Sequence, residues 1–180
     1  MPVVVSLVIV VGAICLLDLV LTVGVIRRLR EHSTLISELG GGRMPVPMLQ
    51  DGETADAFEA VATTGEVVSR DGLSGNTLVG VFSPDCSACK ERLPGFIRLA
   101  RSFSGGRDRV VAVVAEMGGD TEFYRRELEP VARVVIEREG TGINKALHVK
   151  AFPAFGILGE AGKVVVSGLD PEQVVTPAAA

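Results

Sequence analysis

The 180-residue sequence is poor in aromatic residues, in histidine and in clustered positive charge. It has seven Phe, one Tyr and no Trp, so a hydrophobic core must be built mainly from Val, Leu, Ile and Ala. The formal net charge is −4, and no block of Lys and Arg with interleaved aromatics occurs. This excludes the usual electrostatic pattern of a nucleic-acid-binding protein. Hydrophobic residues nevertheless make up 47% of the chain, which is ample for one buried domain.

The first thirty residues contain a long apolar run. Between Val3 and Ile26 it is interrupted only by Ser6, Gly12, Asp18, Thr22 and Gly24. This run exceeds the roughly 20 residues that a helix needs to cross the hydrocarbon layer of a membrane. The run is too long for a secretory signal, and no positively charged segment precedes it. The sequence therefore predicts an uncleaved, single-pass transmembrane anchor over residues 1–30.

Cys15 and Asp18 lie three residues apart and share one face of this predicted helix. An ionisable residue in a membrane span is costly to expose to lipid. Asp18 is therefore interpreted as protonated or facing a partner helix, with Cys15 as a small apolar filler. The alternative is that this face docks the anchor against another membrane protein.

The charges that flank the span bear on its orientation. Arg27, Arg28 and Arg30 follow the apolar run, and on the positive-inside rule alone they would place the C-terminal domain in the cytoplasm.

Residues 31–56 contain Gly-Gly-Gly and Pro-Val-Pro and are predicted to form a linker. A folded domain is predicted over residues 57–180. Residues 58–70 read as a β-hairpin, and the later segments alternate between strand and helix periodicity. Asp120 is the predicted N-cap of one of the helices. The pattern predicts an α/β domain with a central mixed sheet flanked by helices.

Two of the three cysteines lie within the segment VFSPDCSACKERLPGF, where a predicted strand gives way to a predicted helix. A cysteine in the first turn of a helix meets unpaired backbone N–H groups and the positive end of the helix dipole, which stabilise a thiolate. Cys86 is that residue. Cys89, one turn later, is placed to attack a mixed disulfide on Cys86 and release the partner protein. The spacing indicates thiol–disulfide exchange, with Cys86 attacking and Cys89 resolving.

The same pair could instead serve a zinc site or a structural disulfide. Zinc needs four ligands, but the remaining cysteine lies in the predicted span and only His32 and His148 could assist. A disulfide across so short a loop would stabilise little. Neither a metal nor an organic cofactor is expected, since two sulfurs can carry both electrons.

The segment Cys86-Ser87-Ala88-Cys89 after a hydrophobic strand, with Pro94 in the following helix, resembles the active site of the thioredoxin-like superfamily. Phe152-Pro153, after a short helix and before a strand, resembles the family's cis-proline. The hairpin and the segment GILGEAGKVVVSG are similar to the membrane-anchored bacterial TlpA, ResA and MauD type. The resemblance implies a thioredoxin-like fold in which Phe152 and Pro153 form the platform for a substrate strand.

The chain also departs from this family. Asp85 stands where many members have Trp, and its charge opposes thiolate formation if it remains ionised. Its residue type favours a role as N-cap of the following helix, and the alternative is a role in tuning redox potential or partner choice. Ser87 and Ala88, between the cysteines, are further candidates for tuning. The preceding strand lacks the buried carboxylate of thioredoxin itself, for which Glu91 and Glu66 are candidate substitutes.

The leading functional prediction is a membrane-anchored thiol–disulfide oxidoreductase that exchanges disulfides with a client protein. The family resemblance implies a reductant or isomerase in protein maturation, with an extracytoplasmic domain and a membrane redox donor, and this orientation is preferred over the one the arginines indicate. One alternative is a non-enzymatic docking or maturation factor for a membrane partner. Another is a thiol peroxidase, which is disfavoured because no Thr lies in the turn before Cys86.

Overall fold

The computed structural model describes residues 46–116 and 118–174, together with Leu7 and Gly12. The predicted anchor over residues 1–30 therefore lies almost wholly outside the described residues. Among the residues that are described, no helix has both the length and the apolar character needed to cross a membrane.

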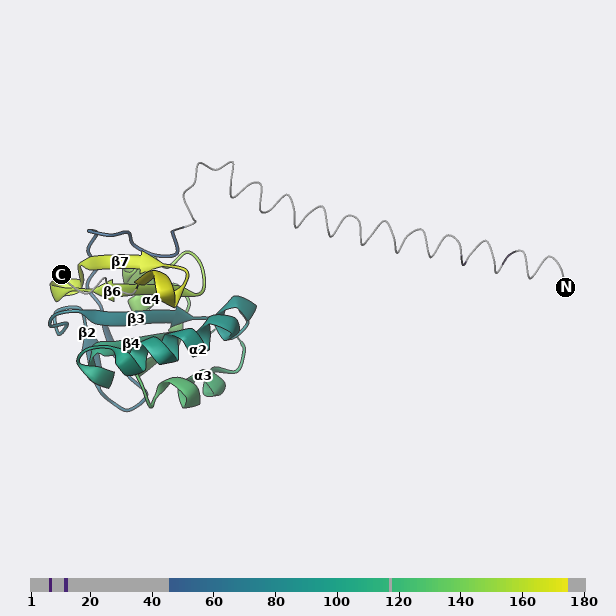
Figure 1. Cartoon of the computed structure of the whole chain (residues 1–180), viewed down its shortest axis with the longest axis horizontal. Coiled ribbons are helices and arrows are strands. Elements are labelled where there is room, and N and C mark those ends of the chain that lie inside the picture. Colours follow the sequence, from purple (N-terminus) through teal and green to yellow (C-terminus); the bar gives the residue numbers. More distant parts are fainter. Residues whose placement is uncertain (1–6, 8–11, 13–45, 117, 175–180) are drawn as a thin grey trace. The chain divides into compact units, whose positions relative to one another are not determined.

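A five-stranded mixed sheet forms the centre of the domain (Figure 1), with the strand order β5-β4-β3-β6-β7. Strands β3, β4 and β5 are parallel, whereas β6 and β7 run antiparallel to their neighbours. The strands are β3 (Thr77–Phe82), β4 (Val110–Glu116), β5 (Arg133–Arg138), β6 (Ala154–Leu158) and β7 (Val164–Gly168). A separate antiparallel hairpin of β1 (Glu59–Val61) and β2 (Val67–Ser69) confirms the predicted one.

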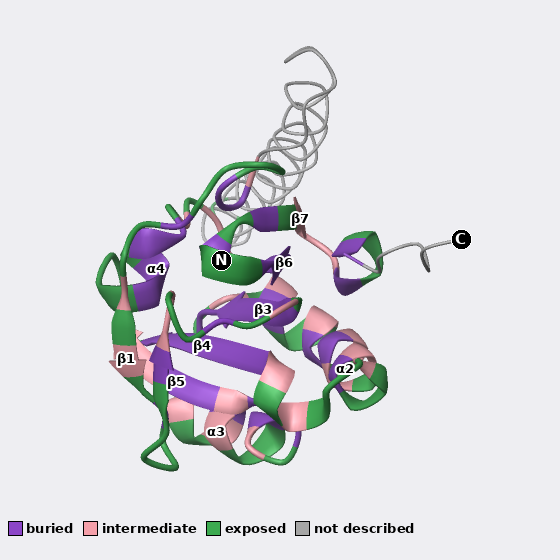
Figure 2. Cartoon of the chain, turned by 90° about the vertical axis from the view of Figure 1, so that its left-hand side faces the viewer, coloured by how far each residue is buried: buried purple, intermediate pink, exposed green. Residues whose placement is uncertain are grey.

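Alternation along the strands divides the core into two layers, because successive side chains of a strand point to opposite faces of the sheet. Leu78 and Phe82 of β3 belong to the buried cluster on the face covered by α2 (Ser87–Ser102) and α3 (Thr121–Leu128). Val79 and Val81 belong to the cluster on the other face, which includes α4 (Gly142–Ala146). Figure 2 shows the central strands buried between these layers. The predicted α/β domain with a mixed sheet is confirmed.

Helix α2 packs closely on β3, and a glycine makes this possible. A Cβ atom on Gly80 would lie 2.5 Å from the Cε2 atom of Phe96, so only glycine leaves room for this ring. The rings of Phe82 and Phe155 lie 5.3 and 5.7 Å from that of Phe96, centroid to centroid. This aromatic group fixes the helix, and hence its first turn, on the sheet.

The folded domain includes residues before Ala57. Met48, Leu49 and Ala55 are buried in the second cluster. The Leu49 N–H donates to the Leu147 carbonyl oxygen at 2.9 Å, and the Ala55 N–H donates to that of Gly162 at 3.0 Å. Residues 46–56, within the predicted linker of residues 31–56, therefore pack as part of the domain. Buried side chains and these backbone hydrogen bonds hold the segment on the domain.

Candidate active site

Cys86 is the N-cap residue of α2. Its backbone is extended, with φ −91° and ψ 114°, and its Sγ atom accepts a hydrogen bond from the Cys89 N–H at 3.3 Å. The Cys86 N–H donates to the Ser83 carbonyl oxygen at 3.2 Å, which closes the turn between β3 and the helix. The sulfur therefore lies where the first, unpaired N–H groups of the helix point.

This arrangement corrects the prediction that Asp85 is the N-cap. The helix begins one residue later than that role would require, and the Cys86 sulfur caps it by accepting a hydrogen bond from the Cys89 N–H. Asp85 is exposed, and its carboxylate lies so close to Gly119 that a Cβ there would be 2.7 Å from its Oδ1 atom. The structure thus leaves Asp85 at the surface beside the cysteine pair.

Cys89 occupies a different environment from Cys86. It is fully buried, and the Ser83 N–H donates to its Sγ atom at 3.4 Å. Burial raises the pKa of the Cys89 thiol to about 12, and the Ser83 N–H and the Arg92 charge oppose this shift. Both cysteines are free thiols, so the described form is the dithiol. The half-buried Cys86 can be reached from solvent, whereas Cys89 is shielded.

Phe152 and Pro153 lie beside the pair, as the resemblance implies. The peptide bond between them is cis, in agreement with the prediction. The Cys86 thiol donates to the Phe152 carbonyl oxygen at 3.4 Å across 66 residues of sequence. Phe152 packs against both core clusters and Pro153 is buried, so the loop is fixed from two sides. The fold therefore brings the two predicted parts of the site together.

Helix α4 precedes this loop and is capped by a carboxylate from β5. Glu137 accepts hydrogen bonds from the N–H groups of Ile143 and Asn144, at 3.1 and 2.6 Å. Burial raises the pKa of Glu137. A Cβ on Gly142 would collide with this carboxylate, which explains the glycine there. The cap fixes the start of the segment that leads to Pro153.

Neither candidate substitute for the thioredoxin carboxylate is among the groups that shift the pKa of Cys89. Glu66 forms an ion pair with Arg107, with 3.0 Å between Oε1 and Nη1, and Glu91 is exposed. The charges that act on Cys89 come from Cys86 and Arg92. Arg92 itself lies 3.3 Å from Asp170, from Nε to Oδ2. The sequence shows that Arg92 follows Cys89 by three residues in α2. It does not show that Arg92 pairs with Asp170, 78 residues later.

Of the other predicted residues, Ser87 is exposed and Ala88 half-buried, both in the first turn of α2. Pro94 lies inside the helix, where it removes one backbone donor. Within residues 46–116 and 118–174, no group of three or more metal-ligating side chains lies close enough to hold a metal ion.

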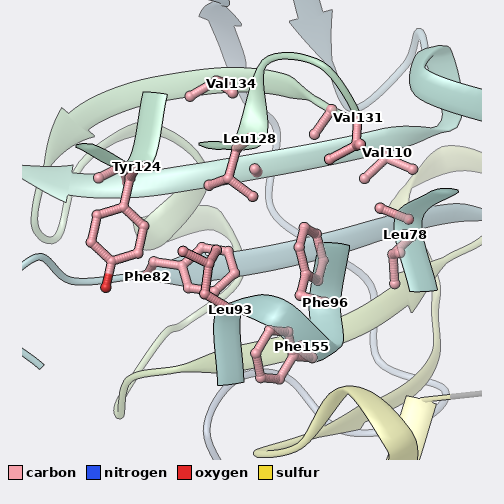
Figure 3. Close-up of a cluster of buried hydrophobic side chains, with 14 of the residues drawn as sticks. Leu78, Phe82, Leu93, Phe96, Val110, Tyr124, Leu128, Val131, Val134 and Phe155 are labelled. Atoms are coloured by element: carbon pink, nitrogen blue, oxygen red, sulfur yellow. The ribbon is translucent and has the colours of Figure 1, made fainter. Parts of the chain in front are cut away.

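Tyr124 was not singled out by the sequence, although it is the only tyrosine. It lies in α3 and belongs to the same buried cluster as Cys89. Figure 3 shows its ring next to Phe82, with the phenol oxygen directed away from the middle of the cluster. Burial raises the pKa of Tyr124, and negative charge on either cysteine would raise it further. The one available signal was the rarity of aromatics in this chain, which could not place the residue beside the cysteines.

No protein-family model matches this sequence, and no curated protein matches it. Solved structures do match. The exposed lipoprotein thioredoxin Etrx1 of Streptococcus pneumoniae aligns with a TM-score of 0.52 and 19% identity over 66% of this chain and 94% of its own. StoA of Bacillus subtilis aligns with a TM-score of 0.53 and 20% identity over 66% of this chain and 93% of its own.

A thio-disulfide isomerase of Thermus thermophilus gives a TM-score of 0.54 and 18% identity over 68% of this chain and 87% of its own. At such low identity these likenesses show the fold alone. The predicted thioredoxin-like fold is confirmed.

Proposed function

We propose that this chain is a thiol–disulfide oxidoreductase of the TlpA, ResA and MauD type, which exchanges disulfides with client proteins through Cys86 and Cys89. The observation that carries the proposal is the unequal placement of the pair. Cys86 is half-buried at a helix N-cap, while Cys89 is fully buried one turn behind it. The fold, shared with the thio-disulfide isomerase of Thermus thermophilus, supports this chemistry.

In the proposed reaction the Cys86 thiolate attacks a disulfide of the client. A Cys86–client disulfide forms, and the second client sulfur leaves with the electron pair and takes a proton from solvent. Cys89 then loses its proton and attacks the Cys86 sulfur, which breaks the mixed disulfide. The client is left reduced and the Cys86–Cys89 pair oxidised, so two electrons have passed without a further cofactor.

The proposed site for the client chain is the loop at Phe152 and Pro153. The Phe152 carbonyl already accepts a hydrogen bond from the Cys86 thiol, so a client strand on this loop would lie next to the attacking sulfur. The nitrogen of Pro153 carries no hydrogen, so it cannot donate a backbone hydrogen bond. The backbone groups of the neighbouring Phe152 are therefore left for the client. Asp85, Ser87 and Ala88 are proposed to tune the potential or the choice of client, because all three adjoin the pair at the accessible end of α2.

The test is reduction of a disulfide-containing model protein such as insulin by the purified chain. We expect the reduced parent to reduce one disulfide per Cys86–Cys89 pair and become oxidised, no reaction by Cys86→Ser, and a trapped mixed disulfide with Cys89→Ser. A parent that fails to reduce any disulfide, or a Cys86→Ser variant with parental activity, would overturn the proposal. If both cysteine variants support the cellular role, the chain is a docking factor instead.

The preferred direction is reduction or isomerisation during maturation of a client protein. Titration against glutathione measures the potential of the pair, and a value near that of strong oxidants, about −120 mV, would contradict this direction.

We further propose that residues 1–30 anchor the chain in the cell membrane, with the domain outside the cytoplasm and a membrane redox donor supplying electrons. The apolar run supports an anchor, and one structurally similar protein is described as an exposed lipoprotein. In intact cells with Cys15 replaced and the protein reduced, a membrane-impermeant thiol reagent should label Cys86. Labelling only after lysis would place the domain inside.

A further inference from the structure

An open groove lies at the surface between helices α2 and α3, which cover the same face of the sheet (Figure 1). It has a volume of about 450 Å³. Its apolar lining comes from Leu93, Pro94 and Ile97 of α2 and from Phe123 of α3. Pro94 is exposed, and Ile97 and Phe123 are only half-buried. The groove therefore offers apolar contact area that the packing of this domain leaves open.

Positive charge borders this groove. Three exposed cations of α2, Lys90, Arg98 and Arg101, line it, and the acidic residue among its described lining is Glu127 of α3. Within residues 46–116 and 118–174 none of the three cations forms an ion pair, whereas Glu127 pairs with Arg126. The chain as a whole has a net charge of −4, so this excess of positive charge is local. Such a surface is complementary to a ligand with both acidic and apolar groups.

The groove follows one stripe of α2. Lys90, Pro94, Ile97 and Arg101 are spaced by four, three and four residues and so share one face of the helix. From Lys90 to Arg101 the helix rises about 17 Å, at roughly 1.5 Å per residue. This length matches about three turns of a helix or about five residues of an extended chain. The groove thus fits a peptide segment rather than a single side chain.

One end of the groove lies close to the candidate active site. Lys90 and Phe123 line both the groove and a second open cleft of about 350 Å³. Pro84 and Asp85, the two residues before Cys86, also line that cleft. A segment in the groove can therefore extend past Lys90 to the end of α2 where Cys86 lies.

We propose that the groove between α2 and α3 is a docking site for the client protein, which binds a client segment with acidic and apolar side chains next to the disulfide to be exchanged. This rests on the proposed function, which supplies the client. The acidic groups of the segment pair with Arg98 and Arg101, and its apolar side chains enter the groove. Asp85 and Asp120 line the second cleft and repel acidic groups, so the stretch of client that reaches Cys86 is neutral or basic.

The apolar lining favours a peptide over an anionic lipid surface as the partner. Lipid headgroups attract the same cations, but a flat layer of headgroups offers no apolar side chains to a groove. A segment of a client protein satisfies both the charged border and the apolar lining.

The experiment uses short synthetic peptides in which a single cysteine forms a disulfide with thionitrobenzoate. The first peptide carries Glu and Leu on one side of the cysteine, the second has Lys in place of Glu, and the third has Ser in place of Leu. When the Cys86 thiolate attacks the peptide sulfur, a Cys86–peptide disulfide forms. Thionitrobenzoate leaves with the electron pair and reports the rate by its absorbance. The full chain is used in the Cys89→Ser background, where the mixed disulfide accumulates.

We expect the Glu–Leu peptide to react about tenfold faster than either of the others. The double variant Arg98→Glu, Arg101→Glu should lose this preference, because reversal of two charges replaces attraction by repulsion and changes binding by about tenfold. The matched control is Arg138→Glu, Lys163→Glu, which reverses two exposed charges outside the groove and should keep the preference. Higher salt should reduce the preference of the parent, since it screens exposed charges.

Equal rates for the three peptides, or a preference that Arg98→Glu, Arg101→Glu retains, would overturn the docking site while mixed-disulfide formation upholds the proposed function. A preference of the full chain for phosphatidylglycerol over phosphatidylcholine vesicles that this variant loses, with no preference among the peptides, would assign the cations to a lipid surface and also overturn it.

Failure to form a mixed disulfide with any peptide would overturn the proposed function instead. Fluorescence anisotropy with Ser in place of the peptide cysteine then tests the groove alone. Binding of the Glu–Leu peptide that Arg98→Glu, Arg101→Glu weakens would support the site for an acidic segment, and absence of binding would overturn it.

Discussion

Cys86 and Cys89 are chemically identical and only three residues apart, yet the structure gives them different properties. Cys86 accepts the N-cap hydrogen bond and lies half-buried at the helix end, whereas Cys89 faces the core from the first turn. Burial disfavours a charged sulfur and an N-cap position favours one. The proposed order, attack by Cys86 and resolution by Cys89, would thus follow from the helical face that each sulfur occupies.

The raised pKa of Cys89 predicts a pH-dependent stability of the reduced protein. Its thiol has a pKa of about 12 when folded and an ordinary value of 9.0 when unfolded, so the unfolded state loses this proton first as pH rises. The free energy of unfolding should therefore be highest below about pH 9 and fall towards pH 12. The slope from this group should approach about 1.4 kcal/mol per pH unit. Urea denaturation in the presence of a reductant measures it.

The control for this prediction is Cys89→Ala, which should lose the cysteine part of the decline. Tyr124 also has a raised pKa and contributes in the same direction, so the difference between the two proteins isolates Cys89. Cys86→Ser should keep the decline, since burial is the main cause of the shift. Equal slopes for the parent and Cys89→Ala would show that the thiol is not held neutral by the fold.

At the scale of elements, helix α2, which carries the candidate active site, depends on the strand beneath it. Gly80 in β3 leaves the space that Phe96 fills, and Phe96 packs on Phe82 and Phe155. The first turn of α2, with both cysteines, follows directly from this docking. The sequence predicts the strand and the helix from their periodicity, but the contact between a glycine and a ring 16 residues away is a tertiary feature.

Gly80→Ala should destabilise the domain. Its Cβ would lie 2.5 Å from one carbon of the Phe96 ring and 2.8 Å from another, and overpacking of a dense core costs about 1–3 kcal/mol. Gly95→Ala in α2 is the matched control, because its Cβ would meet the Pro171 Cγ atom at an ordinary 3.6 Å. Alanine is the better helix former, so this control should be neutral or stabilising by up to about 1 kcal/mol. Chemical denaturation of both variants compares them, and equal effects would contradict the close packing at Gly80.

Pattern-based reasoning succeeds for the elements themselves. Apolar runs mark β3 and β4, Asp120 caps α3 through the Phe123 N–H at 3.1 Å, and the hairpin forms where β-prone residues surround Thr64 and Gly65. It fails at the start of α2, where an aspartate is the usual N-cap type but the cysteine sulfur occupies the position. Residue preference does not fix helix register to one position.

At the scale of the whole molecule, the segment before Ala57 closes the second face of the core. Met48 and Leu49 are buried there, and Thr54 forms an isolated β-bridge with Lys163 next to β7. Both layers pack on the same central sheet. The helices α2 and α3 and the cysteines lie on one face, and the segment before Ala57 covers the other. Loss of one layer therefore weakens support for the other.

Two truncations test this arrangement. A chain that starts at residue 46 should fold and keep disulfide exchange with a soluble client, because it contains both clusters. A chain that starts at Ala57 should lose on the order of 3–6 kcal/mol, since burial of each large apolar side chain contributes about 1.5–3 kcal/mol. Denaturation midpoints measure the difference. Equal stability of the two chains would show that residues 46–56 contribute no packing energy.

The sequence by itself determined the strand and helix pattern, the mixed sheet, and the placement of a Cys-x-x-Cys pair at a strand-to-helix junction. These follow from local spacing, because hydrophobic periodicity and short-range hydrogen bonds act between near neighbours in the chain. Only the tertiary structure decided that the Phe152 carbonyl meets Cys86, that Arg92 pairs with Asp170, and that a lone tyrosine shares a buried cluster with Cys89. Each of these joins residues distant in the sequence through the packing of the sheet, and burial, which sets the chemistry of Cys89, exists only once that packing is complete.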